Sequence, residues 1–572
     1  MQKESVDGNI FKNLSYYHYL VQYIGDIKEE FLNHPFFIVT VLDDNFAILS
    51  IPKDKIEVLE EDLKSSTIVY LKLPEMYTLE QISPVQASQV EFLQIDLPLN
   101  LTGEGVDVAV IDTGIDYLNE ELMDLNNNTR INLIWDQTID SNSNDYDIDI
   151  PFGKVFTKNQ IQGAIDEYKA GRDPYKVVDS KDIIGHGTEM AGLIGATGKD
   201  EQLKGIASKC NFISIKMMED YSYKASYDIN IPVYNVTVIY AALQFLYRYS
   251  LKTNKPLVIY MPFGSNLGNH RGKGVLDYYI DFISMNAKIV VVTCTGNERI
   301  TDCHASGNIT EEEKIKVVEL DVSPGEKKLW LEIWADAPNI ISAEIVSPSG
   351  ENSGIINSLI NVTNTYSFVF EKTIMKVAYH IPEELSGDEL IRIQFYDLQP
   401  GIWKIRLFGN LVLDGNFNVW ISQTGLTKFD TRITPADTYG TIANPGNADF
   451  SVTVAGYNQN NNNMVNYSGM AFSKNYINAI DVAAGAVNAL TIAPSNKNVI
   501  VNGTCVSGCI VSGACAMLFE WGVLKNNDPY MYSKTLKTYL ARGVMSRNGD
   551  MYPNAHWGYG ILNILNMFKN LM

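Results

Sequence analysis

Short apolar runs and helix-like stretches alternate along two parts of the chain, residues 96–308 and residues 429–572. A short apolar run bounded by turn residues is typical of a buried parallel strand. Runs of this kind are VDVAVID, CNFISIKMM, PLVIYMPFG, AKIVVVTCTGN and ADFSVTVAGYN. We therefore predict that the two parts form one α/β domain around a mostly parallel sheet.

A different pattern lies between these two parts. From residue 309 to residue 428, short segments alternate between apolar and polar residues, as in KKLWLEIWAD, ELIRIQFYDL and GNFNVWISQ. Turn residues separate the segments at regular intervals. This pattern predicts an all-β sandwich of the jelly-roll type, inserted into the α/β domain.

The first 95 residues predict a third unit. YHYLVQYIG, the two halves of FFIVTVLDDNFAILSI, and STIVYLKL have strand patterns, whereas DIKEEFLN and KDKIEVLEEDL have helical ones. The resulting order β-α-β-β-α-β is that of a split βαβ, ferredoxin-like unit. Such a unit suits a free-standing binding domain or a folding prodomain. Residues 80–100 are poorly patterned and are predicted to be a linker.

Composition narrows the classes of function. Of the 572 residues, 46% are hydrophobic, and 67 acidic against 45 basic residues give a net charge of −22. The acids are spread along the chain, which argues against nucleic acid or an anionic membrane surface as a partner. We find no signal peptide and no run of about 18 apolar residues, so we expect no membrane span.

The cysteines and acids do not predict a metal site. The six cysteines show no disulfide framework, which favours reduced thiols. Cys505, Cys509 and Cys515 have the spacing C-x3-C-x5-C without a nearby histidine, which is not a zinc spacing. The acid-rich stretch 140–150 does not fit an EF-hand loop. We predict neither a metal nor a cofactor.

Three motifs supply the parts of an acyl-transfer site. Asp112 closes an apolar run in VIDTGID, His186 lies between two glycines in DIIGHGTEMAG, and Cys505 begins a helical run in NGTCVSG. Acyl transfer needs a nucleophile, an imidazole that takes its proton, and a carboxylate that orients the imidazole. The chain order acid, histidine, nucleophile is that of the subtilisin arrangement. Asn297, in TCTGNE, follows a buried strand and is suited to donate to an oxyanion.

Each motif also has a plain structural interpretation. Asp112 alone suits a strand-end turn, Asn297 a left-handed turn residue, and Cys505 a small buried side chain. The remaining histidines lack comparable surroundings and are expected to be structural or exposed. The order of the motifs, each after a predicted strand, favours one common site.

With these motifs the sequence resembles the subtilisin-like serine protease family, and within it the clostridial Csp branch of spore-germination proteases. Blocks that resemble this branch in order are IDTGIDYLNEEL, GHGTEMAGLIGA, MPFGSNLGNHRG, CTGNE, FSVTVAGYN, NGTCVSG and YPNAHWGYGILNILNMF. The resemblance implies a subtilisin-like sheet with helices on both faces. It also implies a retained prodomain over residues 1–95, the subtilisin-like domain over 96–308 and 429–572, and a jelly roll over 309–428.

The resemblance assigns roles to individual residues. It implies that Asp112, His186 and position 505 form the triad and that Asn297 is the oxyanion donor. The strand in MPFGS would bind substrate, with Pro262, Phe263 and Gly264 beside the cleft. The segment near residues 87–97 would lie in or close to this cleft, as the end of the prodomain.

The nucleophile loop departs from the family pattern. The family has serine where this chain has Cys505, and many members have proline where it has Cys509. The stretch usually reading Pro-Asp-Ile-x-Ala-Pro-Gly is here NAIDVAAG, around Asp481, Ala484 and Gly485. A thiol at a helix N-terminus beside an imidazole should be acidified. Sulfur is nevertheless larger than oxygen, and a displacement near 1 Å can cost roughly 100-fold in rate. We expect Ser507, two residues along, to point elsewhere.

Three hypotheses follow for the function. The first is an endopeptidase with a cysteine nucleophile, which by resemblance would act in the bacterial spore and activate a cortex-lytic hydrolase zymogen. The second is a catalytically impaired relative that binds a germinant, a partner protease or another Csp protein and regulates germination. The third, a carbohydrate-binding module with a vestigial enzyme, depends on the jelly roll alone.

Overall fold

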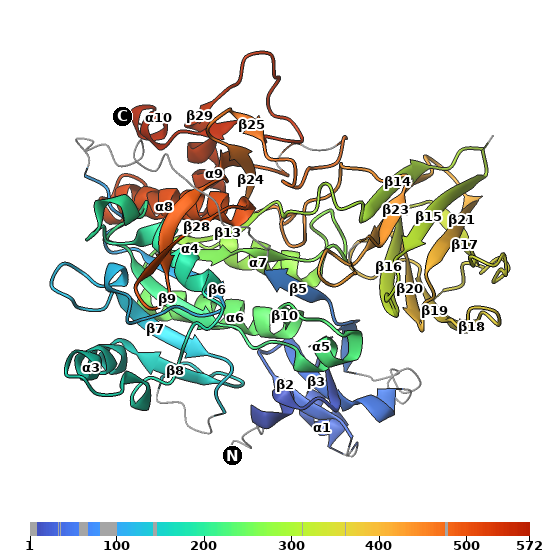
Figure 1. The fold of residues 1–572 in the computed structure, drawn as a ribbon, viewed down its shortest axis with the longest axis horizontal. Helices are drawn as coiled ribbons and strands as arrows, with labels where there is room; N and C mark the ends of the chain where they lie inside the picture. Colours follow the sequence, from blue (N-terminus) through green and yellow to red (C-terminus); the bar gives the residue numbers. More distant parts are fainter. Residues whose placement is uncertain are drawn as a thin grey trace.

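The computed structural model describes residues 8–571 apart from residues 33, 35, 57–66, 80–99, 141–145, 312, 361, 429, 475, 476 and 478. An N-terminal sheet lies beside a large α/β body, and a β-rich insert extends from one end of the body (Figure 1). The predicted architecture, an α/β body around a mostly parallel sheet with an α+β unit and an all-β insert, is confirmed.

The body is built on one large sheet. In the described residues its strand order is β29-β30-β26-β24-β13-β11-β6-β9-β7-β8, with β25 paired to β24. Every neighbouring pair from β7 to β26 is parallel. The strands are β6 Asp107–Asp112, β7 Ile131–Asp136, β8 Lys154–Thr157, β9 Asn211–Lys216, β11 Leu257–Met261, β13 Ile289–Cys294, β24 Val452–Asn458, β25 Asn463–Met464, β26 Val482–Gly485, β29 Val544–Met545 and β30 Ile561–Leu562.

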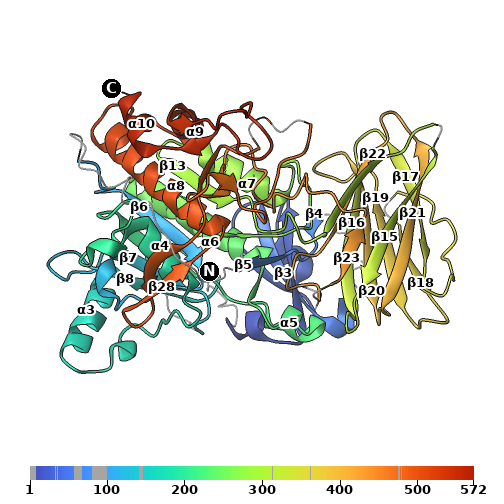
Figure 2. The same cartoon turned by 45° about the horizontal axis from the view of Figure 1, so that its top comes forward.

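Helices cover both faces of this sheet, because the central strands are apolar on both sides. In β6, Val108 and Val110 belong to one core, whereas Ala109 and Ile111 belong to the other. Helices α4 and α8 pack side by side on the first face (Figure 2), and α6 and α7 pack on the second. The helices are α3 Lys158–Lys169, α4 His186–Gly195, α5 Tyr221–Tyr227, α6 Val236–Thr253, α7 Val275–Ser284, α8 Thr504–Phe519, α9 Ser533–Arg542 and α10 Ile564–Lys569.

Helix α8 corrects one expectation from the sequence. Residues Thr504–Leu524 are long and apolar enough to cross a membrane, because a window of 18 residues in this stretch has a mean hydropathy of 1.5, although we expected no such run. Of this window, 83% is buried inside the body. Its apolar composition therefore matches its place as a core helix that packs on the sheet and against α4.

The insert consists of two antiparallel sheets that enclose an apolar core. One sheet has the order β14-β22-β16-β20-β19-β18 and the other β17-β21-β15-β23. Apolar residues alternate along the strands, as the sequence pattern predicted. The strands are β14 His304–Asn308, β15 Ile315–Val322, β16 Lys328–Ala335, β17 Ile340–Val346, β18 Thr363–Ser367, β19 Ile374–His380, β20 Glu389–Tyr396, β21 Gly401–Leu411, β22 Asn416–Ile421 and β23 Arg432–Thr434.

The N-terminal unit is an antiparallel sheet with the order β2-β3-β1-β4. This order suits a split βαβ unit, and the second helix expected in it lies mostly outside the described residues. Its elements are β1 Tyr16–Tyr23, α1 Ile27–Phe31, β2 Ile38–Val41, β3 Phe46–Pro52 and β4 Ile68–Lys72. The next strand, β5 Met76–Leu79, leaves this sheet and pairs with the body.

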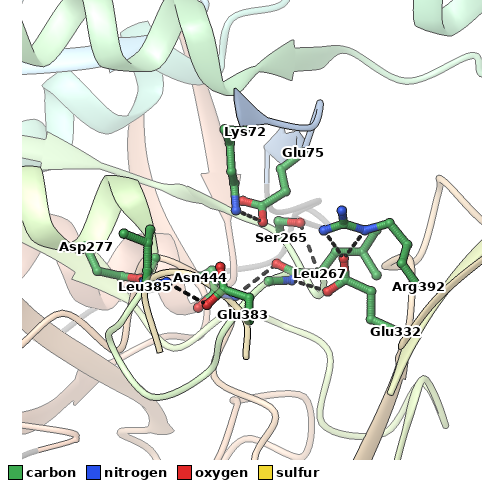
Figure 3. Close-up of polar contacts among 12 residues, drawn as sticks. Lys72, Glu75, Ser265, Leu267, Asp277, Glu332, Glu383, Leu385, Arg392 and Asn444 are labelled. Carbon is green, nitrogen blue, oxygen red and sulfur yellow. Dashed lines mark hydrogen bonds and ion pairs between the residues drawn. The ribbon is translucent and has the colours of Figure 1, made fainter. Parts of the chain in front are cut away.

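Buried charged side chains lie where the three regions meet (Figure 3). Lys72 forms an ion pair with Glu75 at the end of the N-terminal unit. In the insert, Arg392 Nη2 lies 2.7 Å from Glu332 Oε1, and Glu332 Oε2 accepts a hydrogen bond of 2.8 Å from Gly268 N of the body. The insert therefore contacts the body through a buried hydrogen bond to Glu332, whose charge Arg392 balances within the insert.

Candidate active site

Asp112 is the last residue of β6, at the carboxyl edge of the sheet. Ligands and catalytic groups of open α/β sheets gather at this edge. The Asp112 side chain is fully buried, and its Oδ1 accepts a hydrogen bond of 2.7 Å from Thr113 N. A buried carboxylate needs such partners to stay ionised.

His186 is the first residue of α4 and faces Asp112. Its Nδ1 lies 2.9 Å from Oδ1 and 2.8 Å from Oδ2 of Asp112. Gly185, before the helix, has a φ of 100°, which favours glycine. At Gly187, an added Cβ would lie 2.0 Å from Gly114 O, so only glycine allows α4 to approach β6 this closely. The two glycines in GHG are thus explained by the geometry.

A second buried acid organises the start of α4. Asp182 Oδ1 accepts hydrogen bonds from Thr113 Oγ1 and Gly185 N, both at 2.8 Å. Its Oδ2 accepts from Thr188 N at 2.9 Å and Thr188 Oγ1 at 2.6 Å. Sequence reasoning missed Asp182, and its only signal was an acid four residues before the histidine. It ties the loop after Asp112 to the helix that carries His186.

The electrostatic surroundings favour a positive charge on His186. Burial of the ring lowers its pKa, but the charge and hydrogen bond of Asp112 outweigh burial and raise the pKa above its ordinary value. Glu189, one turn further along α4, has its pKa raised to about 7 by burial, against the opposite effect of His186. The second ring nitrogen, Nε2 of His186, is buried and has no hydrogen-bond partner among the described residues.

Cys505 lies at the N-terminal end of α8. The preceding Gly503 has a φ of 133°, which again favours glycine. The Cys505 side chain is fully buried, and its carbonyl oxygen accepts a hydrogen bond of 2.8 Å from Tyr260 Oη. Asn297 lies beside the same helix end, because its Oδ1 accepts from Thr504 N at 3.3 Å and Thr504 Oγ1 at 3.2 Å. The proposed nucleophile and oxyanion donor are therefore neighbours.

The altered residues of the nucleophile loop have packing roles. Cys509 Sγ lies 3.4 Å from Met190 Sδ, so it fills the contact between α8 and α4. Burial raises the pKa of the Cys509 thiol. Ser507 Oγ donates to the carbonyl oxygens of Ala484 at 2.9 Å and Gly485 at 3.1 Å. Ser507 thus points to β26 and is not a substitute nucleophile, as expected.

The strand expected to bind substrate is already paired. Phe263–Gly264 form β12, directly after Pro262, and β12 pairs antiparallel with β5 through Phe263↔Leu79 and Gly264↔Thr78. On its other side β5 pairs with β10 Val233–Asn235. The N-terminal unit thus supplies an extended segment between two strands of the body. Residues 87–97, which we expected near the cleft, lie outside the described residues.

Two comparisons with known proteins both indicate a subtilisin-like protein. Residues 103–351 match the model of the subtilase family. The structure of the CspB protease of Clostridium perfringens superposes with a TM-score of 0.73 at 29% identity, covering 82% of this chain and 94% of that protein. The chain is therefore a subtilisin-like protein, similar to a Csp protease. The matched range contains Asp112, His186 and Asn297, whereas Cys505 lies beyond it.

A structure of a mutant of the epidermin leader peptide processing serine protease (EpiP) of Staphylococcus aureus has a TM-score of 0.47 at 14% identity, covering 97% of this chain and 99% of that protein. No curated protein sequence gives a significant match.

The side chains of the described residues offer no evident place for a metal ion. Among them, no group of three or more histidine, cysteine, aspartate or glutamate side chains is arranged to hold one. Residues 141–145 of the acid-rich stretch lie outside the described residues. The site itself offers a thiol, an imidazole, a carboxylate and an amide.

Proposed function

We propose that this protein is a subtilisin-like endopeptidase of spore germination in which the Cys505 thiol replaces the usual serine. The observation that supports this best is the Asp112–His186 pair at the carboxyl edge of the sheet, together with the peptide strand that lies between β10 and β12. CspB of Clostridium perfringens is a protease. By this likeness, the substrate would be a protein, and we propose a cortex-lytic hydrolase zymogen in the bacterial spore.

The residues suit a thiol mechanism in two halves. In the first, His186 takes the Cys505 proton, and the thiolate forms a C–S bond with the peptide carbonyl carbon. The carbonyl oxygen becomes an oxyanion, for which Asn297 is the donor. As the C–N bond breaks, the leaving amine takes the proton from His186. In the second half, a water molecule gives its proton to His186 and its oxygen to the thioester carbon, and the thiolate leaves. Asp112 stabilises the imidazolium in both halves.

Two observations favour a second candidate, a catalytically impaired regulator. The cleft strand β5 belongs to the chain itself and is paired on both sides, with β10 and β12. The N-terminal unit that carries β5 also has the buried Lys72–Glu75 ion pair at its junction with the other regions (Figure 3). In this case the protein would bind a germinant, or another Csp protein, without cleaving it.

Release of the N-terminal unit distinguishes the two candidates. We would purify the natural chain, Cys505→Ser, and each of these with His186→Ala, and follow the chain by electrophoresis and intact mass. Cleavage of the natural chain that His186→Ala abolishes supports the thiol endopeptidase. Cleavage only in Cys505→Ser supports the impaired regulator. Incubation with a cortex-lytic hydrolase zymogen then tests the substrate, since an active protease must shorten the zymogen and its His186→Ala variant must not.

A further inference from the structure

We propose that the loop by which the chain leaves the β-rich insert, residues 422–427 (the exit loop), is an additional peptide-binding subsite of the cleft. It would accept an extended peptide that carries an uncharged, medium-sized apolar side chain at the place now held by Met76. This inference rests on the proposed function, because it assumes that a protein substrate binds between β10 and β12 as β5 does.

Gln423 in the exit loop connects the peptide strand to the cleft wall. Its Nε2 donates hydrogen bonds to Met76 O and to Gly264 O, both at 3.1 Å. Its Oε1 accepts from Asn266 N at 3.3 Å. The Gln423 side chain is only 3% exposed, so these bonds are made in a dry environment where an unpaired amide would be costly. Gln423 thus extends the backbone recognition of β12 by one residue.

Leu426 closes an apolar pocket around the Met76 side chain. Met76 is 3% exposed and Leu426 is 5% exposed, and both belong to one buried cluster. The other walls of the pocket come from α5 and from the segment that leads into β10, which lie beside β5 in Figure 1. The buried members from these walls are Tyr223, Ile229 and Val233.

The backbone of the exit loop fits closely against this wall. Gly425 has a φ of 89°, and an added Cβ there would lie 2.4 Å from Cδ1 of Ile231. Leu426 N and Thr427 N both donate to Gln423 O, at 3.0 and 3.2 Å, so the loop forms one turn. This turn holds Gln423 and Leu426 in fixed positions against the segment that contains Met76.

The exit loop also contacts the residue next to the oxyanion donor. Thr424 N and Thr424 Oγ1 each donate to Glu298 Oε2 at 3.1 Å, and Glu298 directly follows Asn297. A segment seated against Gln423 and Leu426 is therefore connected, through the exit loop and Glu298, to the chain that carries Asn297. We infer that occupation of the subsite orders this part of the cleft.

The chemistry of the subsite defines what it accepts. Gln423 binds a main-chain carbonyl, which every peptide presents, and so it does not select a side chain. The buried members of the pocket around Met76 are apolar apart from the Tyr223 hydroxyl, so an aspartate there would be buried in largely apolar surroundings. Methionine and leucine have similar volumes and should both fit.

Hydrogen exchange tests the subsite without requiring catalysis. In the full chain carrying His186→Ala, we would measure amide exchange over residues 76–79 for Gln423→Ala and for Leu426→Ala. We expect exchange about fivefold to tenfold faster than in the parent, since each variant removes one hydrogen-bond or packing contribution to the closed state of β5. The matched controls are Gln399→Ala and Leu413→Ala, a half-buried and an exposed residue of the same insert, and these should leave exchange unchanged.

A second measurement uses the cleavage reaction. In a Cys505→Ser chain that releases its N-terminal unit, Met76→Leu should keep the release rate within about twofold, and Met76→Asp should lower it at least about tenfold. Amide exchange in β16 serves as the control for folding of the insert. If Leu426→Ala changes exchange in β16, the smaller substitution Leu426→Val is used instead.

The two measurements separate failure of the subsite from failure of the proposed function. If no variant ever cleaves but exchange responds as expected, the subsite stands and the endopeptidase proposal fails. If exchange over residues 76–79 is the same in Gln423→Ala, Leu426→Ala and the controls, the subsite proposal is overturned, whether or not the chain cleaves. Equal release rates for Met76→Asp and Met76→Leu would overturn it as well.

Discussion

Gly187→Ala should separate His186 from Asp112 with little change in chemical composition. The added Cβ would lie 2.0 Å from Gly114 O and 3.0 Å from Asp112 Cβ, whereas ordinary contacts begin near 3.4 Å. Both neighbours belong to the end of β6 and the residues after it, so neither can yield as a flexible side chain would. The start of α4 must therefore move by more than about 1 Å, and such a displacement can lower a catalytic rate roughly 100-fold.

The same crowding should also reduce stability. Overpacking of a well-packed site typically costs about 1–3 kcal/mol, which in a domain of this size lowers the melting temperature by several degrees, about 2–4 °C per kcal/mol. Gly163→Ala is the matched control, because Gly163 lies within α3 and nothing lies within 4 Å of an added Cβ. That variant should be neutral or gain up to about 1 kcal/mol from helix propensity.

Three measurements on the two variants test the reasoning. NMR of 15N-histidine-labelled protein should show the pKa of His186 falling back toward its ordinary value in Gly187→Ala but not in Gly163→Ala. Thermal unfolding should show the loss of stability in Gly187→Ala alone. In a Cys505→Ser chain that cleaves itself, Gly187→Ala should slow cleavage. If the two variants have the same His186 pKa and the same melting temperature, the close approach of α4 to β6 is not what positions His186.

Four further results are expected. Asp277→Asn should stabilise the protein at pH 8 but not at pH 4 in urea unfolding. Burial raises the Asp277 pKa to about 7, so the folded protein is progressively destabilised as pH rises from the ordinary aspartate pKa to that value. The His186–Asp112 pair should also lose its contribution to stability as pH rises. Because the His186 pKa is raised in the folded protein, this contribution is complete below about pH 6.5 and is lost once pH has passed the folded pKa. The stability difference between the natural chain and His186→Gln should therefore shrink at alkaline pH. Ser507→Ala should cost about 1–2 kcal/mol by removing two hydrogen bonds, whereas Ser512→Ala, on the same helix with an unpartnered hydroxyl among the described residues, should be neutral; equal effects would show that the β26 contacts of Ser507 carry no stability. Arg392→Met should cost roughly 3–5 kcal/mol because it leaves Glu332 buried and unpaired, and the half-exposed Arg406→Met should cost much less.

The elements that depend on local pattern could be predicted from the sequence. Strand β6 and the alternating strands of the insert have periods that a short window of sequence contains, and both are present. The pairing of Asp112 with His186 could also be expected, because the motifs follow the chain order acid, histidine, nucleophile of the subtilisin arrangement.

The features that sequence reasoning missed depend on contacts distant in the chain. Strand β5 has only four residues, and its partners β10 and β12 lie far along the chain, at Val233–Asn235 and Phe263–Gly264, so no local pattern marks it. The same holds for Gln423, whose partners Met76 and Gly264 lie in two other regions. Asp182 is close to His186 in sequence, but its role depends on Thr113 at the end of another strand.

The stability that the protein loses by burying Asp112 and His186 is relevant to whether the site is catalytic. A fully buried Asp112 and a His186 whose Nε2 has no hydrogen-bond partner among the described residues are less stable than apolar side chains of similar volume would be. A chain that used its cleft only to bind would lose nothing by replacing the pair. Gly185 and Gly187, which serve to bring α4 onto β6, would then also be unnecessary. The pair and its glycines therefore support the proposed proton transfer. The residues that depart from the family pattern, at positions 505 and 509, both lie on the helix that carries the reacting atom. Replacing that atom alone, by Cys505→Ser, is consequently the substitution that separates the two candidate functions.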